Sequence, residues 1–198
     1  KKIPCGEKII IRNLFYSTIK DFSKYEGSDS VKSLRDLESE GKILNSIDGL
    51  INVRDKYVMT EIFEKLDVPH IKTYQLDNSP NELLEWIDQT ENRSNNGVII
   101  KDRFGGLGKG IVKVKKQGSY YLTDISCVED SSPKYINETF SANELKEVFD
   151  KYLYDYELIG QPYVPSSYEF SNPGESESIR VIDIGSKDFL SMRRIAQS

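Results

Sequence analysis

The chain has 198 residues, enough to bury a core without disulfides or metal ions, and its 37% hydrophobic and 30% charged residues are typical of a globular protein rather than a disordered or fibrous one. Its 27 Lys and Arg residues against 32 Asp and Glu residues give a net charge of −5, which argues against binding driven by nucleic-acid phosphates. The 2 cysteines, Cys5 and Cys127, lie far apart, so neither a disulfide framework nor a cysteine-rich zinc site is indicated.

The cysteine usage and the lack of long apolar runs predict a cytoplasmic protein without membrane contact. No apolar run reaches the roughly 18 residues that a membrane span needs, and residues 1–5 lack the apolar stretch of a signal peptide. The chain starts without a methionine and ends at Ser198, directly after an expected strand. We therefore expect a segment of a longer protein.

Hydrophobic periodicity predicts helices and strands that combine into an α+β fold with antiparallel pairs. Helical spacing occurs in residues 30–41, in a stretch that Asp55 caps and Pro69 ends, in a stretch that begins at Pro80, and after a capping box of Ser141 and Glu144. Strands are expected at residues 8–12, 71–76, 98–101, 111–114 and 157–164, and as a hairpin of residues 179–184 and 189–195. Residues 165–178, rich in Ser, Pro, Gly and Glu, are expected to form a loop.

The segment that carries the most chemistry is VIIKDRFGGLGKGIV, residues 98–112. From Lys101 to Gly110 it holds four glycines and three cations, so that backbone N–H groups can surround an anion while Lys101 points at it from a strand end. It is not a P-loop, because Lys109 is followed by Gly110 and a strand comes next. The segment alone is equally compatible with a phosphate cradle and with a flexible hairpin that its lysines keep soluble.

The order of several such segments resembles the ATP-grasp superfamily. The resemblance lies in NSIDGLINVRDKYVMTEIFEKLDVPHIKTYQL, VIIKDRFGGLGKGI and SIRVIDIGSKDFLSMRRIA, and it covers roughly residues 37 to 196. These segments look most like the branch that contains the ribosomal-protein glutamate ligase and glutathione synthetase. Each piece alone is weak evidence, and the specificity lies in their joint order.

The resemblance implies an ATP-grasp fold, in which two α+β subdomains clamp ATP. Residues 1–54 would then be the end of an N-terminal α/β domain, residues 55–160 the central ATP-grasp subdomain, and residues 161–198 the incomplete start of the C-terminal subdomain. Members of the family join a carboxylate to an amine through an acyl phosphate and form ADP. The implied partners are therefore ATP, a carboxylate and an amine, with glutamate or another amino acid as the starting guess, and with neither nucleic acid nor membrane.

Residue by residue, the resemblance assigns the nucleotide contacts to three groups. Lys56 and Lys101 match the two lysines that hold the nucleotide phosphates. The loop that folds over the phosphates corresponds to Phe104 and the residues that follow it, among them Gly105, Gly106, Gly108, Lys109 and Gly110. The hinge strand, whose backbone reads the adenine edge, corresponds to Gln161, Pro162, Tyr163 and Val164.

Three arginines match the family's catalytic positions. Fixed guanidinium groups suit such positions because negative charge develops there on phosphoryl and carboxylate oxygens. The three arginines are Arg180, Arg193 and Arg194. The chain departs from the family pattern at Ser178, where an acidic residue is usual, so Glu177 and Glu169 are the candidates for the sugar contact. The family's magnesium ligands match no residue of this chain, and we expect the Mg2+ site beyond residue 198.

Two other functions stay open at this point. Some family members bind ATP in a regulatory or structural role without turnover, and others phosphorylate a hydroxyl. Magnesium-dependent ADP release distinguishes a ligase from a binding module, and a requirement for an amine distinguishes it from a kinase. Because family members are commonly dimers or tetramers, a homo-oligomer is also open.

Overall fold

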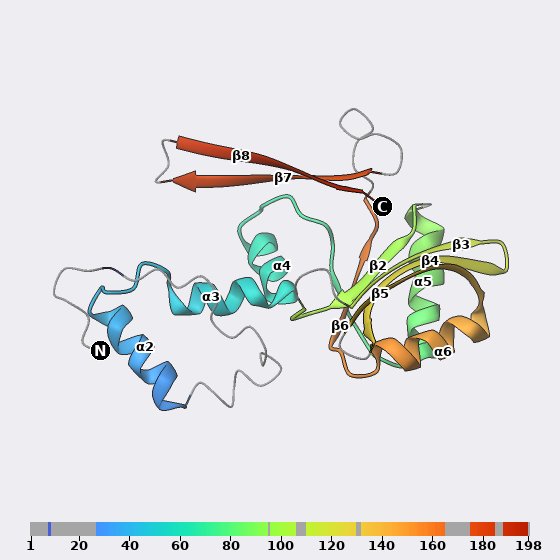
Figure 1. The fold of residues 1–198 in the computed structure, drawn as a ribbon, viewed down its shortest axis with the longest axis horizontal. Helices are drawn as coiled ribbons and strands as arrows, with labels where there is room; N and C mark the ends of the chain where they lie inside the picture. The colour runs from blue at the N-terminus through green and yellow to red at the C-terminus, as the bar shows by residue number, and fades with distance from the viewer. Residues whose placement is uncertain are drawn as a thin grey trace. The chain divides into compact units, whose positions relative to one another are not determined.

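The computed structural model describes residues 8, 27–94, 96–105, 110–129, 132–164, 175–184 and 188–197. The chain divides into two compact units, Lys1–Pro162 and Tyr163–Ser198. The helices of the first unit are α2 (Asp29–Ser39), α3 (Ile47–Arg54), α4 (Lys56–Lys65), α5 (Pro80–Ser94) and α6 (Ala142–Leu153) (Figure 1). Its strands are β1 (Tyr74–Leu76), β2 (Val98–Asp102), β3 (Ile111–Gln117), β4 (Tyr120–Glu129), β5 (Ser132–Ser141) and β6 (Leu158–Pro162). The second unit contains β7 (Glu175–Ile184) and β8 (Asp188–Gln197).

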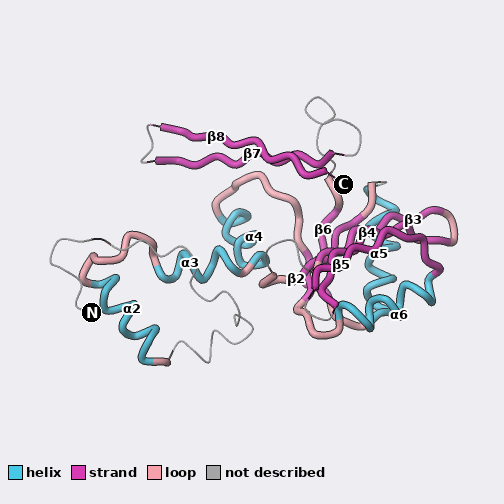
Figure 2. Tube along the Cα trace, viewed as in Figure 1, coloured by secondary structure: helices cyan, strands magenta, loops and turns pink. Residues whose placement is uncertain are grey.

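The strands of the first unit form one sheet in the order β1-β6-β2-β3-β4-β5. Each strand pairs antiparallel with its neighbours, and β6, late in the sequence, lies between β1 and β2. The strands are coloured magenta in Figure 2. In the second unit β7 and β8 form an antiparallel ribbon. Helices combined with antiparallel sheets confirm the predicted α+β class.

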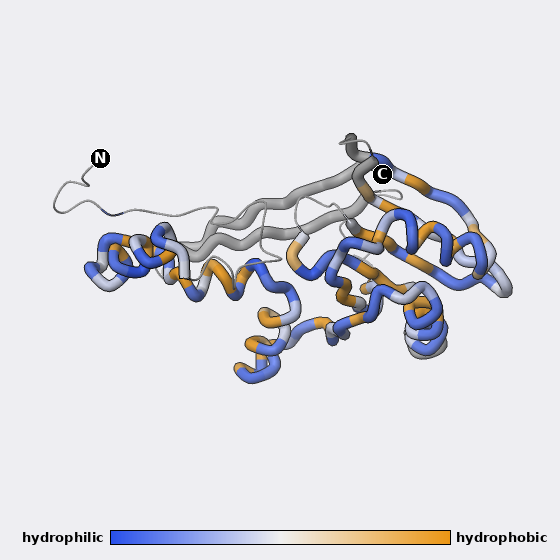
Figure 3. Tube along the Cα trace, turned by 90° about the horizontal axis from the view of Figure 1, so that it is seen from below, coloured by the Kyte–Doolittle hydropathy of each residue, from blue (hydrophilic) through white to orange (hydrophobic). Residues whose placement is uncertain are grey.

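Helices α5 and α6 pack on one face of the sheet and bury the core of the first unit (Figure 1). Both helices alternate hydrophobic and hydrophilic residues along their turns (Figure 3), as an amphipathic helix on a sheet requires. The predicted capping box at the start of α6 is present, with Glu144 N–H donating to Ser141 Oγ and the Glu144 carboxylate accepting from Ser141 N–H. The core contains Leu83, Ile87, Val98, Ile100, Val112, Leu145, Phe149, Leu153 and Leu158.

Gly160 allows the close approach of α5 to β6. A Cβ atom at this position would lie 2.6 Å from Cζ2 of Trp86 and 2.8 Å from Cδ1 of Leu76, closer than real side chains come. The indole of Trp86 therefore lies directly on the backbone of β6. This contact fixes the strand whose next residue, Gln161, belongs to the candidate site.

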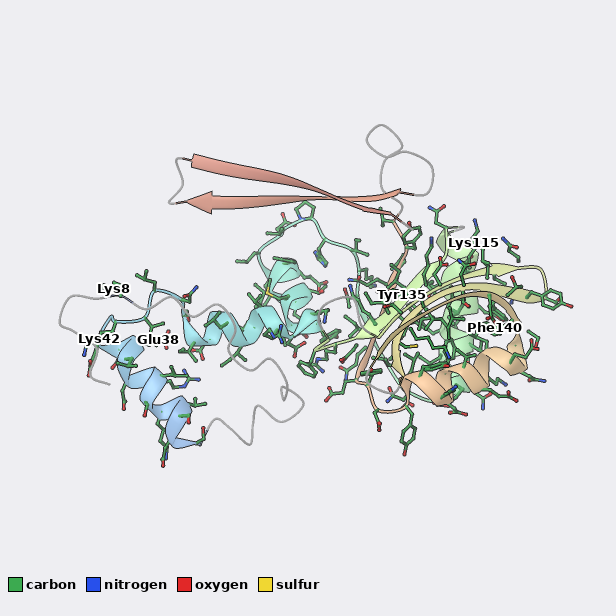
Figure 4. All side chains as sticks on the ribbon, viewed as in Figure 1. Lys8, Glu38, Lys42, Lys115, Tyr135 and Phe140 are labelled. Atoms are coloured by element: carbon green, nitrogen blue, oxygen red, sulfur yellow. The ribbon has the colours of Figure 1, made fainter. Side chains whose placement is uncertain are left out.

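The α2–α3 region is held by side-chain hydrogen bonds to the backbone and by an ion pair between two side chains. The carboxylate of Glu38 accepts a hydrogen bond of 2.9 Å from Ile47 N–H, and Arg35 pairs with Asp48 at 2.9 Å. Lys8 donates to the carbonyl of Gly41 beyond the end of α2, near Glu38 and Lys42 in Figure 4. Both helices begin at serine caps, Ser28 and Ser46.

Several predicted elements differ in extent from the observed ones. Helix α4 ends at Lys65 rather than at Pro69, because the chain turns at Asp67 with φ of 54°. The expected strand at residues 71–76 is confined to Tyr74–Leu76, which is as far as its pairing with β6 extends. The sequence reading did not identify α3 or β5, and of the expected strand at residues 8–12 the structure describes Lys8 alone.

The expectation of a loop over residues 165–178 is wrong at its end. Strand β7 begins at Glu175, because the polar residues there pair with the far end of β8, Glu175 with Gln197 and Ser176 with Ala196. The remainder of that range, residues 165–174, lies outside the described residues. The domain boundaries at residues 54 and 160 stay predictions.

Candidate functional site

Lys101 lies on β2 and reaches across to β6. The pairing of Ile99 with Gln161 places Lys101 and Gln161 diagonally on the same face of the two strands. Lys101 Nζ donates a hydrogen bond of 2.6 Å to Gln161 Oε1. Burial lowers the pKa of Lys101, because a desolvated ammonium group is less stable than a hydrated one.

The amide of Gln161 is held on its other side by Thr73, in the segment before β1. Gln161 Nε2 donates to Thr73 Oγ1 at 2.6 Å, and Thr73 is only 8% exposed. Thr60 of α4 lies 3.0 Å from the same hydroxyl oxygen. A hydrogen-bonded row therefore runs from α4 through Thr73 and β6 to the ammonium group of Lys101 on β2.

Lys56 is the first residue of α4, and its side chain holds the beginning of the glycine-rich segment. Its Nζ donates to the carbonyl oxygens of Asp102 at 2.9 Å and Arg103 at 3.1 Å, and also to that of Gly105. The pKa of Lys56 is lowered to about 8, mainly by burial and also by the positive charge of Lys101, while the negative charge of Asp102 partly opposes this lowering. The two ammonium groups are thus close enough to repel each other.

Asp55 connects the start of α4 to Arg103. Its Oδ1 caps the helix by accepting from Tyr57 N–H and Val58 N–H, and both of its oxygens accept from Arg103. Burial raises the pKa of Asp55, but the hydrogen bonds from Arg103, Val58 and Tyr57 together with the charge of Arg103 outweigh burial and leave it below the usual value of 3.8. The Arg103 guanidinium also lies 5.5 Å from the ring centroid of Tyr57 and 5.1 Å from that of Phe104.

Asp102 brings together the two ends of the glycine-rich segment. Its N–H donates to the carbonyl of Gly110 at 3.1 Å, and its Oδ1 accepts from Phe104 N–H at 3.1 Å. Gly110 has φ of +66°, a conformation that favours glycine. Residues 106–109 are therefore flanked by anchored residues on both sides.

A cavity of about 620 Å³ lies beside the Thr60–Thr73 pair, between α4 and the segment that leads into β1. Its walls carry one acidic and one basic side chain, Glu64 and Lys72, and a histidine, His70. The lining residues are Tyr57, Thr60, Glu64, His70, Lys72, Thr73, Tyr74 and Gln75.

The structure brings five of the predicted site residues together in the first unit. They are Lys56, Lys101, Gly105, Gly110 and Gln161. Pro162 ends β6, and Tyr163 and Val164 follow it at the start of the second unit. Gly106, Gly108 and Lys109 lie outside the described residues, as does Glu169.

The remaining predicted residues lie on the ribbon of the second unit, where the backbone is described. Glu177 and Arg180 are in β7, and Arg193 and Arg194 are in β8. Ser178 pairs with Arg194, Ile179 with Arg193, and Arg180 with Met192. Their roles in catalysis and sugar binding stay predictions.

Sequence reasoning missed Thr60 and Thr73 as site residues, and identified Asp55 only as a helix cap and Arg103 only as one cation of the glycine-rich segment. An acidic cap directly before a candidate phosphate lysine was an available signal for Asp55. For Thr73 the sequence carries no such signal, since its partner Gln161 is 88 residues away.

Two observations concern metal ions and membranes. Within the described ranges, no group of three or more His, Cys, Asp or Glu side chains is placed to hold a metal ion. The helices of this part of the chain are also too short or too polar to cross a bilayer. The position of the magnesium ligands stays a prediction.

Comparison with known proteins gives two curated relatives of the same kind, although no protein-family model matches. The tetrahydromethanopterin:alpha-L-glutamate ligase of Methanococcus maripaludis is 34% identical over 82 residues, covering 41% of this chain and 26% of the relative. The ligase of the same name from Methanocaldococcus jannaschii is 33% identical over 75 residues, covering 38% of this chain and 24% of the relative. These relatives support an ATP-grasp superfamily assignment.

The matched part of this chain spans about a quarter of the length of these relatives, 26% and 24%. Among solved structures, it aligns with carboxyaminoimidazole ribonucleotide synthase from Aspergillus clavatus complexed with ATP. That alignment has a TM-score of 0.46 and 18% sequence identity, and it covers 81% of this chain and 32% of the other.

Proposed function

We propose that this chain is the nucleotide-binding part of an ATP-dependent carboxylate–amine ligase that forms ADP. The observation that supports the proposal best is the convergence of Lys56 and Lys101 at the glycine-rich segment. Both ammonium groups are partly desolvated, and they repel each other. Holding them charged at one site therefore costs free energy, and a bound anion would reduce that cost. A polyphosphate is the anion that fits two cations at the base of a glycine-rich segment best.

The residues of the chain fit a nucleotide as follows. Lys101 binds phosphate from the strand, and Lys56 contributes its charge, because backbone carbonyls satisfy its protons without neutralising it. Gly105 and Gly110 carry no side chain, so their own backbone can lie close to the phosphates. The backbone of Gln161 to Val164 reads the adenine edge.

The proposed reaction joins a carboxylate to an amine. When bound, ATP would supply its terminal phosphoryl group to a carboxylate oxygen as ADP leaves, and the amine nitrogen would then displace phosphate from the acyl carbon and lose a proton as the amide bond forms. Arg180, Arg193 and Arg194 are the proposed source of positive charge for these oxygens. The two relatives are named as glutamate ligases, which supports an amino acid of that class as the amine substrate.

A titration of the folded chain with a fluorescent ATP analogue tests nucleotide binding. Lys101→Ala should weaken binding by about 1.5–3 kcal/mol, the range for a hydrogen bond to a charged group. The matched control is Lys65→Ala, at the exposed far end of α4, which should leave affinity unchanged. Equal affinities for the wild type and Lys101→Ala would exclude Lys101 from the site.

Turnover is tested on the longer protein that contains this chain. Release of ADP that requires magnesium, a carboxylate and an amine supports the ligase. Binding of nucleotide without ADP release would instead favour a binding module, and ADP release that needs a hydroxyl acceptor but no amine would favour a kinase.

A further inference from the structure

The row of side chains behind Lys101 has a defined hydrogen-bond polarity. Lys101 Nζ can only donate, so the Gln161 atom 2.6 Å away must be the oxygen of the amide. The nitrogen of the amide then faces Thr73 Oγ1 at 2.6 Å and donates to it. A reversed amide would place two donors against each other at Lys101.

Thr73 can accept this hydrogen bond because its own proton has another acceptor. Its Oγ1 lies 3.2 Å from the carbonyl oxygen of Ile71, which accepts from it. The hydroxyl oxygen is thereby left as the acceptor for Gln161. With 8% of the residue exposed, water has little access to replace the threonine oxygen.

The same hydroxyl connects to the helix that carries Lys56. Thr60 Oγ1 lies 3.0 Å from Thr73 Oγ1 and 3.0 Å from the backbone carbonyl oxygen of Lys56, one turn earlier in α4, and its single proton is donated to one of these two oxygens at a time. Thr73 therefore contacts both Thr60 of α4 and the side-chain amide of Gln161 that holds Lys101.

We propose that Thr73 is a positioning residue that sets the spacing between Lys101 and Lys56, and through it the affinity for the phosphates of the nucleotide. The inference rests on the proposed function, because it assigns both lysines to phosphate binding. Thr73 itself contacts no phosphate. It orients the amide of Gln161, and this amide limits the rotamers of the long Lys101 side chain.

The test is the binding of ATP and of adenosine to the chain and to two threonine variants. Thr73→Val keeps the shape of the side chain and removes the acceptor, and it should weaken ATP binding by about tenfold, near the loss expected for one or two hydrogen bonds. Adenosine should bind both proteins equally, because it has no phosphate for the lysines to hold. Thr73→Ser keeps the hydroxyl and should restore ATP affinity.

A double-mutant cycle separates positioning from general damage. In a Lys101→Ala background, Thr73→Val should have no further effect on ATP affinity, because the side chain that it positions is gone. Additive losses, or equal losses for ATP and adenosine, would overturn the positioning role. If Thr73→Val does not fold, Gln161→Met, which removes the amide at similar length, should show the same selective and non-additive loss.

Failure of the proposed function has a different signature. It would appear as no ATP binding by the wild type, or as unchanged binding by Lys101→Ala, and either result overturns the positioning role as well. Normal ATP binding that depends on Lys101 but not on Thr73 would overturn the positioning role alone.

Discussion

Arg103 binds Asp55 through two hydrogen bonds, from Nε to Oδ1 at 2.8 Å and from Nη2 to Oδ2 at 2.6 Å. The same carboxylate caps α4, the helix that begins with Lys56. Arg103 is also the second residue after Lys101, at the start of the glycine-rich segment. The Arg103–Asp55 pair therefore attaches the glycine-rich segment to α4, and Lys56, the first residue of α4, holds the same segment through its own hydrogen bonds.

Removing the guanidinium should destabilise the fold markedly. Arg103→Met leaves the Asp55 carboxylate with little solvent, since the two side chains are 13% and 17% exposed, and should cost about 2–3 kcal/mol, somewhat below the range for a fully buried pair. Urea unfolding measures this change. The control is Arg35→Met, whose pair with Asp48 is much more exposed and should contribute about 1 kcal/mol or less. Equal losses in both variants would contradict a special role for the Asp55 pair.

The Asp55 pair should also contribute to acid sensitivity. The pKa of Asp55 is lower in the folded chain than its ordinary value of 3.8, so the unfolded chain binds more protons in acid. The stabilisation is thus present above the ordinary pKa and is lost as the pH falls through the lowered one. The difference in unfolding free energy between wild type and Arg103→Met should shrink on acidification, and a difference that stays constant down to about pH 2 would contradict this.

Nucleotide binding should weaken in mild alkali because of Lys56. Its pKa of about 8 means that the ammonium loses its proton above this pH, whereas an anion binds the charged form. Affinity should therefore fall by up to about tenfold per pH unit above the pKa, and binding there should take up protons. Calorimetry in buffers of different ionisation enthalpy measures this uptake.

Lys56→Met identifies the group that titrates. This variant has a side chain of similar length without charge, and we expect lower affinity with a flatter pH profile. An unchanged pH profile in the variant would assign the titration to another group. The first candidate is Lys101, whose pKa is also lowered by burial. In the absence of nucleotide the lowered pKa predicts stability that rises from about pH 8 towards 10.5, since the unfolded chain binds more protons in that range.

A methyl group at Gly160 should disturb the packing of α5 on β6. Gly160→Ala would place its Cβ 2.6 Å from Cζ2 of Trp86, so the ring, which packs against the core, would have to shift. We expect a loss of about 1–3 kcal/mol in unfolding free energy, the range for overpacked cores. Gly27→Ala, where nothing lies within 4 Å of the added atom, is the control and should change little. Wild-type stability of Gly160→Ala would show that this contact is not tight.

The sequence predicted those parts of the site that local pattern determines. Lys101 at a strand end and Gly105 and Gly110 around a turn follow from spacing and backbone freedom, and the helix cap at Asp55 follows from the residue type. What it could not predict is which distant side chains meet. Arg103 and Asp55 are 48 residues apart and Thr73 and Gln161 are 88 apart, and only the tertiary fold brings the members of each pair together.

The missed strand residues of β5 and β7 have a common physical cause, which is that polar strand segments lack a hydrophobic signal. Strand β5 is at the edge of its sheet and pairs only with β4, so residues such as Tyr135, 79% exposed, need no apolar alternation. The first residues of β7 are polar as well, and their pairing with β8 extends the ribbon beyond the stretch that hydrophobicity indicates. Local composition therefore favoured a loop where backbone hydrogen bonds continue.

The last prediction concerns the arginines of the β7–β8 ribbon. Ser178 pairs with Arg194 and Arg180 with Met192, so Arg180 and Arg194 occupy positions of one face, while Arg193, opposite Ile179, occupies the other. If the face that contains Arg180 meets the reacting groups, Arg194→Lys in the longer enzyme should preserve ATP binding. It should lower turnover by about tenfold or more, roughly 1.4 kcal/mol, because lysine keeps the charge but not the planar fork that holds two oxygens.

Arg193→Lys is the control for this substitution, since it changes the neighbouring position of the same strand on the other face. Its turnover should stay near that of the wild type, and the measured quantities are the ligation rate at saturating substrates and the affinity for the ATP analogue. A loss in Arg193→Lys with none in Arg194→Lys would assign the catalytic face to the other side of the ribbon. Near-wild-type turnover in both would identify the pair as surface charge, because a guanidinium that stabilises the transition state cannot be exchanged for an ammonium group without a change in rate.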